Sequence, residues 1–467
     1  MAETAKPYLT GHYTPVPDEI TAHGLTVHGA IPPELNGRYF RNGHNPKPGV
    51  IPTHWFKGSG MIHGLRLQDG RAEWYRNRWV RTPALDGVPY IGDDGVPDLR
   101  VSDAATHVIE HAGRILALQE ANLPYELTPD LRTVGAYDFG GKLTSAMTAH
   151  PKTDPVTGEL HFFGYSPFPP YLTHYVADAT GEVVRAQTVD GAGPSLMHDF
   201  GLTAHHVIWL DLPVVFDPTE HSGIPYGWSD THTPRIGVMP RSGPPVVTWY
   251  EVEPGALLHV ANAYEDERGR IVLSGPRYDR SAWGQTWKWW TGAPGYAPTP
   301  IVGATAHRWI LDPATAAARE EAVDDLVAEF PTINEDRTGL PHRFGYSVAF
   351  PGAGLTEHAL VKYDHATGRR EVVPMGRDRM PGEAVFVPAA GGTREDDGYL
   401  LTVVSDLVAD ASQLLVLDAS APGAGPLATV DLPRRVPSGI HGSWIADAPD
   451  AAHTPSATGT TTLEETS

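Results

Sequence analysis

The chain has 467 residues, a formal net charge of −21 and no cysteine. The acidic balance makes nucleic acids and anionic membrane surfaces poor partners, and the lack of cysteine excludes disulfides, thiolate metal ligands and a cysteine nucleophile. The 49 glycines and 44 prolines favour many tight turns over long helices.

Residues 1–20 are polar and rich in proline, without the apolar core of a signal peptide. Nowhere do about 18 apolar residues follow one another, which argues against a spanning helix. We therefore expect a cytoplasmic protein without a transmembrane segment, and leave peripheral membrane contact open. We expect residues 1–20 to form an arm, 21–445 a single catalytic domain, and the low-complexity residues 446–467 a disordered tail.

Short apolar stretches, rich in β-branched and aromatic residues, predict strands. Turn signals such as Asp69-Gly70 and Asp397-Gly398 separate them. This alternation continues from about Gly37 to Trp444 without a repeat of fixed length, and it predicts meandering antiparallel sheets. The clearest predicted strands are 107–110, 114–118, 206–210, 270–273, 399–404 and 413–417.

Two segments differ from this pattern. Residues 314–329 contain strong helix formers between two prolines, which predicts a short helix, although pairing with neighbouring strands could override that propensity. Residues 283–290 hold four tryptophans. They form either an apolar tunnel mouth or membrane-contacting lip, or a strand packed between sheets.

Four histidines stand in distinctive surroundings. They are His150 before Pro-Lys-Thr-Asp, His198 before Asp-Phe, His259 before Val-Ala-Asn-Ala-Tyr-Glu, and His441 before Gly-Ser-Trp. Imidazole nitrogen suits zinc, copper, iron and nickel. Because 48, 61 and 182 residues separate them, they could share a metal only if the fold brings them together. The alternative is that they are ordinary members of a set of 23 histidines, solvated or bonded to the backbone.

Further motifs run in order along nearly the whole chain. They are 35–43, 54–64, 158–165, 235–238, 382–388, 395–400 and 439–444. With these motifs the chain resembles the carotenoid cleavage oxygenase family, which includes lignostilbene-cleaving enzymes and the retinoid isomerohydrolase of the eye. The resemblance implies an all-β, seven-bladed β-propeller, whose long loops form a cap over one Fe²⁺ per chain on the axis.

The resemblance also implies roles for individual residues. His150, His198, His259 and His441 match the iron ligands. Glu120, Glu329 and Glu383 match glutamates that accept hydrogen bonds from ligand histidines and offset the charge of the metal. Thr106 matches a threonine that crowds one open position on the iron. Glu265 is a weaker candidate, which could instead hold a loop.

The implied reaction is cleavage of a C=C bond by dioxygen to give two carbonyl products, with an apolar small molecule as substrate. Phe56, Gln119, Phe168 and Tyr171 are the candidate substrate-binding residues. Lignostilbene-cleaving relatives carry lysine where this chain has Gln119, so we favour a carotenoid or apocarotenoid over a hydroxystilbene or vinylphenol. Two further alternatives are a non-oxidative isomerase and a propeller scaffold without activity.

Overall fold

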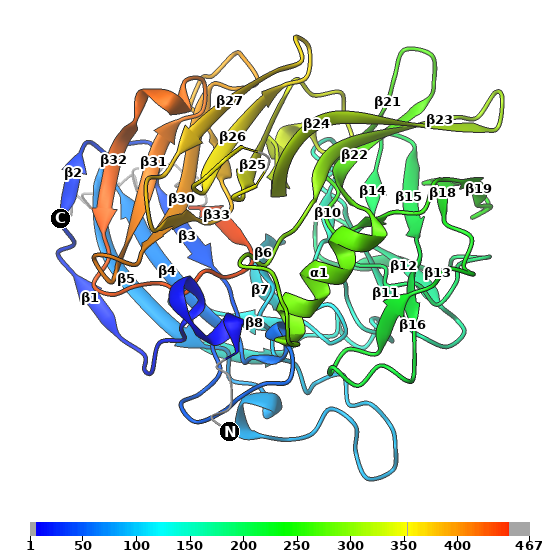
Figure 1. Ribbon diagram of the computed structural model, residues 1–467, viewed down its shortest axis with the longest axis horizontal. Coiled ribbons are helices and arrows are strands. Elements are labelled where there is room, and N and C mark those ends of the chain that lie inside the picture. The colour runs from blue at the N-terminus through cyan, green and yellow to red at the C-terminus, as the bar shows by residue number, and fades with distance from the viewer. Residues whose placement is uncertain (1–5, 353, 448–467) are drawn as a thin grey trace, which may run out of the picture.

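The computed structural model describes residues 6–352 and 354–447. Antiparallel sheets stand around a central axis and form a seven-bladed β-propeller (Figure 1). This confirms the predicted fold class. All six of the clearest predicted strands are present in the structure.

The first four blades follow one another along the chain. Blade 1 contains β1 (Thr21–His23), β3 (Gly37–Arg41), β4 (Met61–Gln68), β5 (Arg71–Trp79) and β33 (Gly442–Ala446). Blade 2 contains β6 (His107–His111), β7 (Arg114–Leu118), β8 (Tyr125–Leu127) and β9 (Thr133–Ala136). Blade 3 contains β10 (Lys152–Thr153), β11 (Leu160–Tyr165), β12 (Leu172–Ala177) and β13 (Val183–Thr188). Blade 4 contains β14 (Gly201–Leu202), β15 (His206–Asp211), β18 (Arg235–Pro240) and β19 (Thr248–Glu251).

Blades 5 and 6 share one long strand, β24. Blade 5 contains β20 (Ala256–Leu257), β21 (Asn262–Glu265), β22 (Ile271–Tyr278), β23 (Thr305–Asp312) and the start of β24 (Ala317–Thr332). Blade 6 contains the end of β24, β25 (Phe344–Ala349), β26 (Ala359–Asp364) and β27 (Arg369–Pro374). Blade 7 contains β28 (Arg379–Pro381), β29 (Val385–Pro388), β30 (Gly398–Asp406), β31 (Ala411–Asp418), β32 (Pro426–Asp431) and β2 (Val27–Gly29).

The helix predicted at 314–329 is wrong, because residues 317–329 lie in β24. Residues 317–322 pair with β23, and 328–332 pair with β25. Hydrogen bonds to two neighbouring strands outweigh the helix propensity of the alanines and glutamates.

Two strands from the ends of the chain close the ring of blades. β33 pairs with β3, so that Gly37 lies opposite Ala446 and Arg41 lies opposite Gly442. β2 pairs with β32 in blade 7. Ala446, which we assigned to the tail, is therefore the last residue of β33, and residues 448–467 of the predicted tail lie outside the described residues.

The tryptophan-rich segment is a helix, α1 (Arg280–Thr291), so the strand alternative is wrong. Asp279 caps its start by accepting a hydrogen bond from the Ala282 amide at 2.8 Å. Gly292 ends it in the left-handed conformation, with φ of +62°. Helical spacing turns three of the four tryptophans into the interior, where Trp283, Trp289 and Trp290 are buried.

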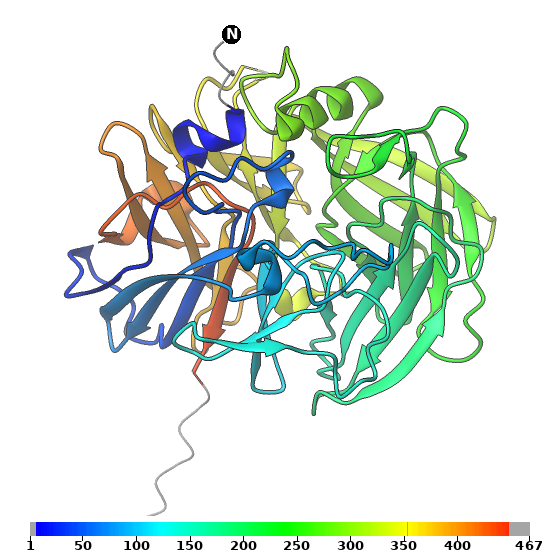
Figure 2. The same cartoon turned by 90° about the horizontal axis from the view of Figure 1, so that it is seen from below.

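The N-terminal segment packs on this helix. The ring of Tyr13 lies 4.8 Å from that of Trp289, and the Tyr8 hydroxyl donates to the Pro52 carbonyl at 2.8 Å. The short 3₁₀ helices η1 (Pro7–Leu9) and η2 (Gly11–Tyr13) therefore share one face of the molecule with α1, whereas the chain leaves β33 on the opposite face (Figure 2). Residues 1–5 of the predicted arm lie outside the described residues.

The remaining 3₁₀ helices are η3 (Trp55–Lys57), η4 (Pro83–Asp86), η5 (Glu335–Arg337) and η6 (Pro422–Ala424), and a small hairpin comprises β16 (Val214–Phe216) and β17 (Tyr226–Trp228).

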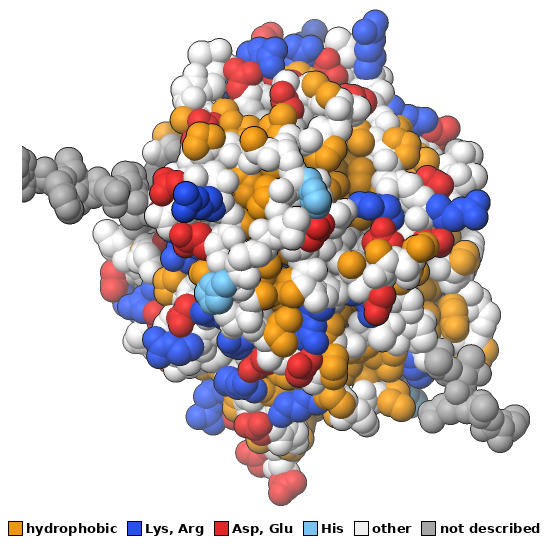
Figure 3. All heavy atoms as spheres, turned by 90° about the vertical axis from the view of Figure 1, so that its left-hand side faces the viewer, with side chains coloured by type: hydrophobic (Ala, Val, Ile, Leu, Met, Phe, Trp, Pro, Cys, Tyr) orange, Lys and Arg blue, Asp and Glu red, His pale blue; other side chains and the backbone are white. Residues whose placement is uncertain are grey.

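The surface carries both signs of charge. On the face shown in Figure 3, acidic and basic side chains are interspersed, with apolar side chains between them. Within residues 6–352 and 354–447, no helix has the length and apolar character needed to cross a membrane.

A buried histidine pair lies within blade 3. His161 Nδ1 lies 3.3 Å from His174 Nε2, and Arg241 donates to His161 Nε2 at 3.1 Å. Burial lowers the pKa of His161 to about 3 and holds the pKa of His174 well below its ordinary value. Both imidazoles therefore stay neutral in the folded protein at pH values where they become protonated in the unfolded chain.

We predict that the free energy of unfolding falls as the pH drops below about 6.5, the ordinary histidine pKa, and continues to fall towards pH 3. From His161 alone, the loss between pH 8 and pH 5 is about 2 kcal/mol, at about 1.4 kcal/mol per pKa unit. Urea unfolding of wild type and His161→Gln at both pH values checks this. Between pH 8 and pH 5, the free energy of unfolding of the variant should fall by about 2 kcal/mol less than that of wild type. As a control, replacing the exposed His23 with Gln should leave the wild-type fall unchanged. An equal fall in all three proteins would contradict the prediction.

Candidate metal centre

The blades bring the four predicted ligands to the axis at the starts of their inner strands. His150 comes just before β10, His198 just before β14, and His441 immediately before β33. His259 lies between β20 and β21. Because the inner strands of different blades approach one another at the axis, residues far apart in the sequence become neighbours.

The four rings lie close to one another. Nε2 of His198 lies 3.0 Å from Nε2 of His150 and 3.4 Å from Nε2 of His259. The ring centroid of His441 lies 4.7 Å from that of His150 and 5.0 Å from that of His259. One nitrogen from each of His150, His198 and His259 falls within 4.8 Å of the others, which is close enough to share an ion.

Three of these histidines are bonded to the three predicted glutamates. His259 Nδ1 donates to Glu329 at 2.7 Å, and His441 Nδ1 donates to Glu383 at 3.0 Å. His198 Nδ1 is in contact with Glu120. A hydrogen on Nδ1 leaves the Nε2 lone pair pointing to the axis, which is the tautomer that a metal ligand needs.

His150 is held differently. Its amide donates to the Thr148 hydroxyl at 3.1 Å, and no carboxylate within the described residues bonds to its ring. The structure therefore pairs each glutamate with one histidine and leaves the fourth histidine without an acidic partner.

Each carboxylate also accepts a second hydrogen bond, which fixes its orientation. Tyr165 donates to Glu120, Tyr278 donates to Glu329 at 3.0 Å, and the amide of Gly442 donates to Glu383 at 2.9 Å. We did not predict the two tyrosines. Tyr165 ends one of the family motifs, which was the available signal, whereas Tyr278 lies outside all of them.

Glu329 reaches His259 because the strand is irregular there. The register between β24 and β25 shifts between Glu329 and Thr332, and Phe330 has φ of +56°. Such a conformation is unfavourable for a bulky residue and is kept only where its surroundings impose it. It places the Phe330 ring 5.5 Å from the ring of His259.

Asp199 connects three of the ligand segments. It directly follows His198 in the sequence. Its carboxylate accepts a hydrogen bond of 2.7 Å from the amide of Val260, the residue after His259. The same carboxylate forms an ion pair of 3.0 Å with Lys152, which lies two residues after His150. Its side chain is almost fully buried. Sequence reasoning gave this aspartate no role, although it stands beside a ligand.

The electrostatics of the site favour a cation. Burial, followed by the neighbouring imidazoles, holds the pKa of His150 and His441 well below the ordinary value, so their nitrogen lone pairs are free. Burial acts to lower the pKa of His259, but Glu329 outweighs it and the pKa is raised, so a metal ion competes with a proton there. Burial raises the pKa of Glu383, whose charge is costly unless a cation lies nearby.

The donor set fits a divalent transition metal. Nε2 of His441 is buried, and no group in the described part of the chain forms a hydrogen bond with it. A buried polar nitrogen without a partner is unfavourable, and coordination of a metal removes that cost. Imidazole nitrogens backed by carboxylates are common ligands of iron, zinc, copper and nickel.

Thr106 and Gln119 contact each other and immediately precede His107 and Glu120 in the sequence. Thr106 is buried and donates to the Gln119 side-chain oxygen at 3.2 Å. The same oxygen accepts the Ala105 amide at 3.1 Å. His107, the residue after Thr106, has its ring centroid 5.3 Å from that of His441, although sequence reasoning gave it no role.

The remaining candidates lie farther out. Phe56 packs on Trp290 of α1 at 5.0 Å between ring centroids, Phe168 is largely exposed and packs on Phe216, and Tyr171 is partly buried. Glu265 bonds to Thr203, His205 and His206 instead of to a predicted ligand. It holds a loop, which was the alternative interpretation.

Comparisons with known proteins agree with this architecture. The family model described as retinal pigment epithelial membrane protein matches residues 13–446. A carotenoid cleavage oxygenase of Mycobacterium tuberculosis is 39% identical, over 95% of this chain and 98% of its own length. A carotenoid 9,10(9',10')-cleavage dioxygenase 1 of Arabidopsis thaliana is 33% identical, over 94% and 90%.

Among solved structures, the cobalt-substituted Synechocystis apocarotenoid oxygenase superimposes with a TM-score of 0.81 at 25% identity, covering 94% of this chain and 98% of that one. The family-model match, residues 13–446, includes the strands of all seven blades. The chain therefore belongs to the carotenoid cleavage oxygenase family and is an oxygenase of that family.

Proposed function

We propose that the protein holds one Fe²⁺ per chain with His150, His198, His259 and His441, and that it cleaves a C=C bond of a carotenoid or apocarotenoid with dioxygen to give two carbonyl products. The convergence of four imidazoles, three of them bonded to carboxylates, carries the proposal. When bound, iron supplies the dioxygen chemistry that amino-acid side chains lack.

The protein's own groups position and balance the metal. Glu120, Glu329 and Glu383 orient three imidazoles and offset the double charge of the ion. Thr106, whose hydroxyl is directed to Gln119, would turn its methyl group towards the centre and crowd one coordination position. Zinc would fit the same nitrogens but has no redox chemistry, so the oxygenase reaction of the family favours iron.

A cluster of apolar side chains near the metal centre, referred to below as the apolar wall, is an argument for an apolar substrate. One cluster of buried side chains extends from Trp55 and the tryptophans of α1 to Phe330, which touches the ring of His259. A long polyene could lie along this wall and keep water from the reacting bond. Phe56 belongs to the same wall, and we retain Phe168 and Tyr171 as candidates nearer the surface.

The contacts of Gln119 support a carotenoid over a hydroxystilbene. Its side-chain oxygen is already occupied by Thr106 and Ala105, and an amide cannot stabilise a phenolate as a lysine would. The names of the Mycobacterium tuberculosis and Arabidopsis thaliana relatives support the same substrate class.

Replacing Glu329 with Gln should keep the fold and weaken metal binding by about 10-fold or more, because the bond to His259 loses its negative charge. Calorimetric titration of metal-free protein with Fe²⁺ under nitrogen measures this. Glu265→Gln is the matched control, since its carboxylate contacts His205 and His206 instead. His259→Ala should fold and lose the metal. Wild-type affinity in Glu329→Gln would argue against the assigned role.

Iron-loaded protein should convert a carotenoid or apocarotenoid into two carbonyl products, each labelled when ¹⁸O₂ is supplied. Products should be trapped within seconds by reduction with borohydride, because aldehyde oxygen exchanges with water. The substrate panel includes hydroxystilbenes and vinylphenols, and His259→Ala is the inactive control. Turnover of stilbenes alone would overturn the substrate proposal, and unlabelled products would overturn oxidative cleavage.

A further inference from the structure

A cavity of about 490 Å³ connects the metal centre with the surface. His150, His259 and His441, all buried, line its inner end. Its lining also includes Glu335 of η5 and Ala446 at the end of β33, which are exposed to solvent. The C-terminal end of β33 lies on the face of the molecule opposite α1 (Figure 2), so the part of the cavity lined by Ala446 is on that face.

Among the charged side chains that line this cavity, acidic ones outnumber basic ones. Four carboxylates line it, from Glu110, Asp199, Glu335 and Glu383, whereas Lys152 is the one lysine or arginine in the lining described. Lys152 is paired with Asp199, which leaves the other three carboxylates without a lysine or arginine partner in the lining. A cavity lined by one sign of charge concentrates ions of the opposite sign and raises their rate of arrival.

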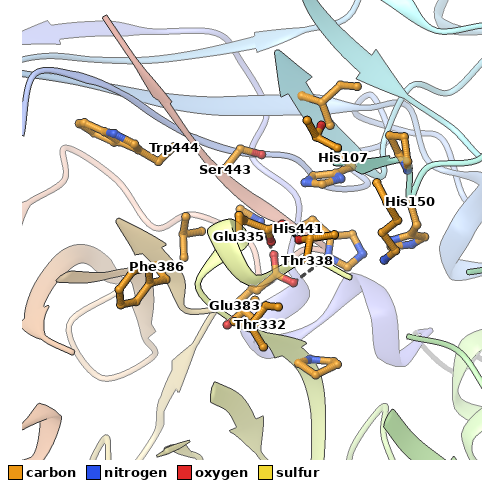
Figure 4. Close-up of a pocket in the computed structure, with 18 of the residues that line it drawn as sticks. His107, His150, Thr332, Glu335, Thr338, Glu383, Phe386, His441, Ser443 and Trp444 are labelled. Carbon is orange, nitrogen blue, oxygen red and sulfur yellow. Dashed lines mark hydrogen bonds and ion pairs between the residues drawn. The ribbon is translucent and has the colours of Figure 1, made fainter. Parts of the chain in front are cut away.

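The carboxylates form a path that ends at a ligand. Figure 4 shows Glu335, Glu383 and His441 as neighbours in the cavity. Thr338 donates to Glu335 at 2.9 Å and fixes its orientation, and Glu383 accepts the hydrogen bond from His441 at 3.0 Å. Glu335 therefore stands between solvent and the carboxylate that already serves the metal centre.

The opposite side of the centre has a different chemical character. There, the buried aromatic cluster extends from the helix α1 to Phe330. A hydrated divalent ion would have to lose its water against apolar side chains, which is strongly unfavourable. The two sides of the centre thus suit different molecules: the apolar side suits a polyene, and the acidic side suits a cation.

We propose that the metal ion reaches its four histidines through this axial cavity, with Glu335 as its first acidic contact on the way. The inference rests on the proposed function, in that the histidines bind a divalent ion. It predicts that the charge at position 335 controls the rate of metal uptake, while the histidines control how much metal is bound.

Metal-free protein is mixed with Co²⁺ in a stopped-flow instrument, and binding is followed by the visible absorbance of the coordinated ion. Cobalt is a suitable probe because a structural neighbour has been crystallised in a cobalt-substituted form. The variants are Glu335→Lys, the milder Glu335→Gln, and the control Asp336→Lys. Asp336 lies next to Glu335 on η5 and is exposed, but it is absent from the described cavity lining, so its replacement makes the same change of charge off the path.

Glu335→Lys should slow uptake by about 10-fold at low ionic strength, and the difference should shrink in high salt. Glu335→Gln should slow it by about 3-fold, and Asp336→Lys should stay within about 2-fold of wild type. All proteins should reach one Co²⁺ per chain. Unchanged rates in both Glu335 variants, or equal slowing by Asp336→Lys, would overturn the route. Failure of wild type to bind Co²⁺ would instead overturn the proposed function.

Discussion

The hydrogen bond from a ligand imidazole to a buried carboxylate is the interaction on which the site depends. His198 of blade 4 meets Glu120 of blade 2, and Glu383 of blade 7 meets His441 at the start of blade 1. These bonds cross from one blade to another, so they depend on how the blades pack around the axis. They also fix which nitrogen of each ring faces the axis, which a metal centre requires. The pairing of β33 with β3 therefore supports the metal centre, because it holds His441 in place.

The two sides of this centre are chemically opposite. The side under α1 holds a cluster of buried aromatic rings, whereas the other side holds a cavity in which carboxylates outnumber lysines and arginines. In the proposed reaction, this separation brings the apolar substrate and the metal ion to the same point from different directions.

Much of the fold and the site could be predicted from sequence, for different physical reasons. Short β-branched stretches gave correct strands because strand periodicity is local. Distinct motifs marked four histidines and three glutamates that the structure brings together. The helix predicted at 314–329 and the strand alternative for 283–290 failed because neighbouring segments decide the outcome. β24 is a strand because it pairs on both sides, and α1 is a helix whose tryptophans pack on the N-terminal segment. The roles of Asp199 and Tyr278 arise only from contacts across blades, which no local pattern reveals.

The central claim is that four imidazoles from distant parts of the chain surround one metal ion. Anomalous diffraction at the iron edge, on crystals of iron-loaded protein, tests it most directly. The account predicts a single peak per chain, about 2.1 Å from Nε2 of each of His150, His198, His259 and His441. A peak elsewhere, or one contacting only some of these rings, would contradict it.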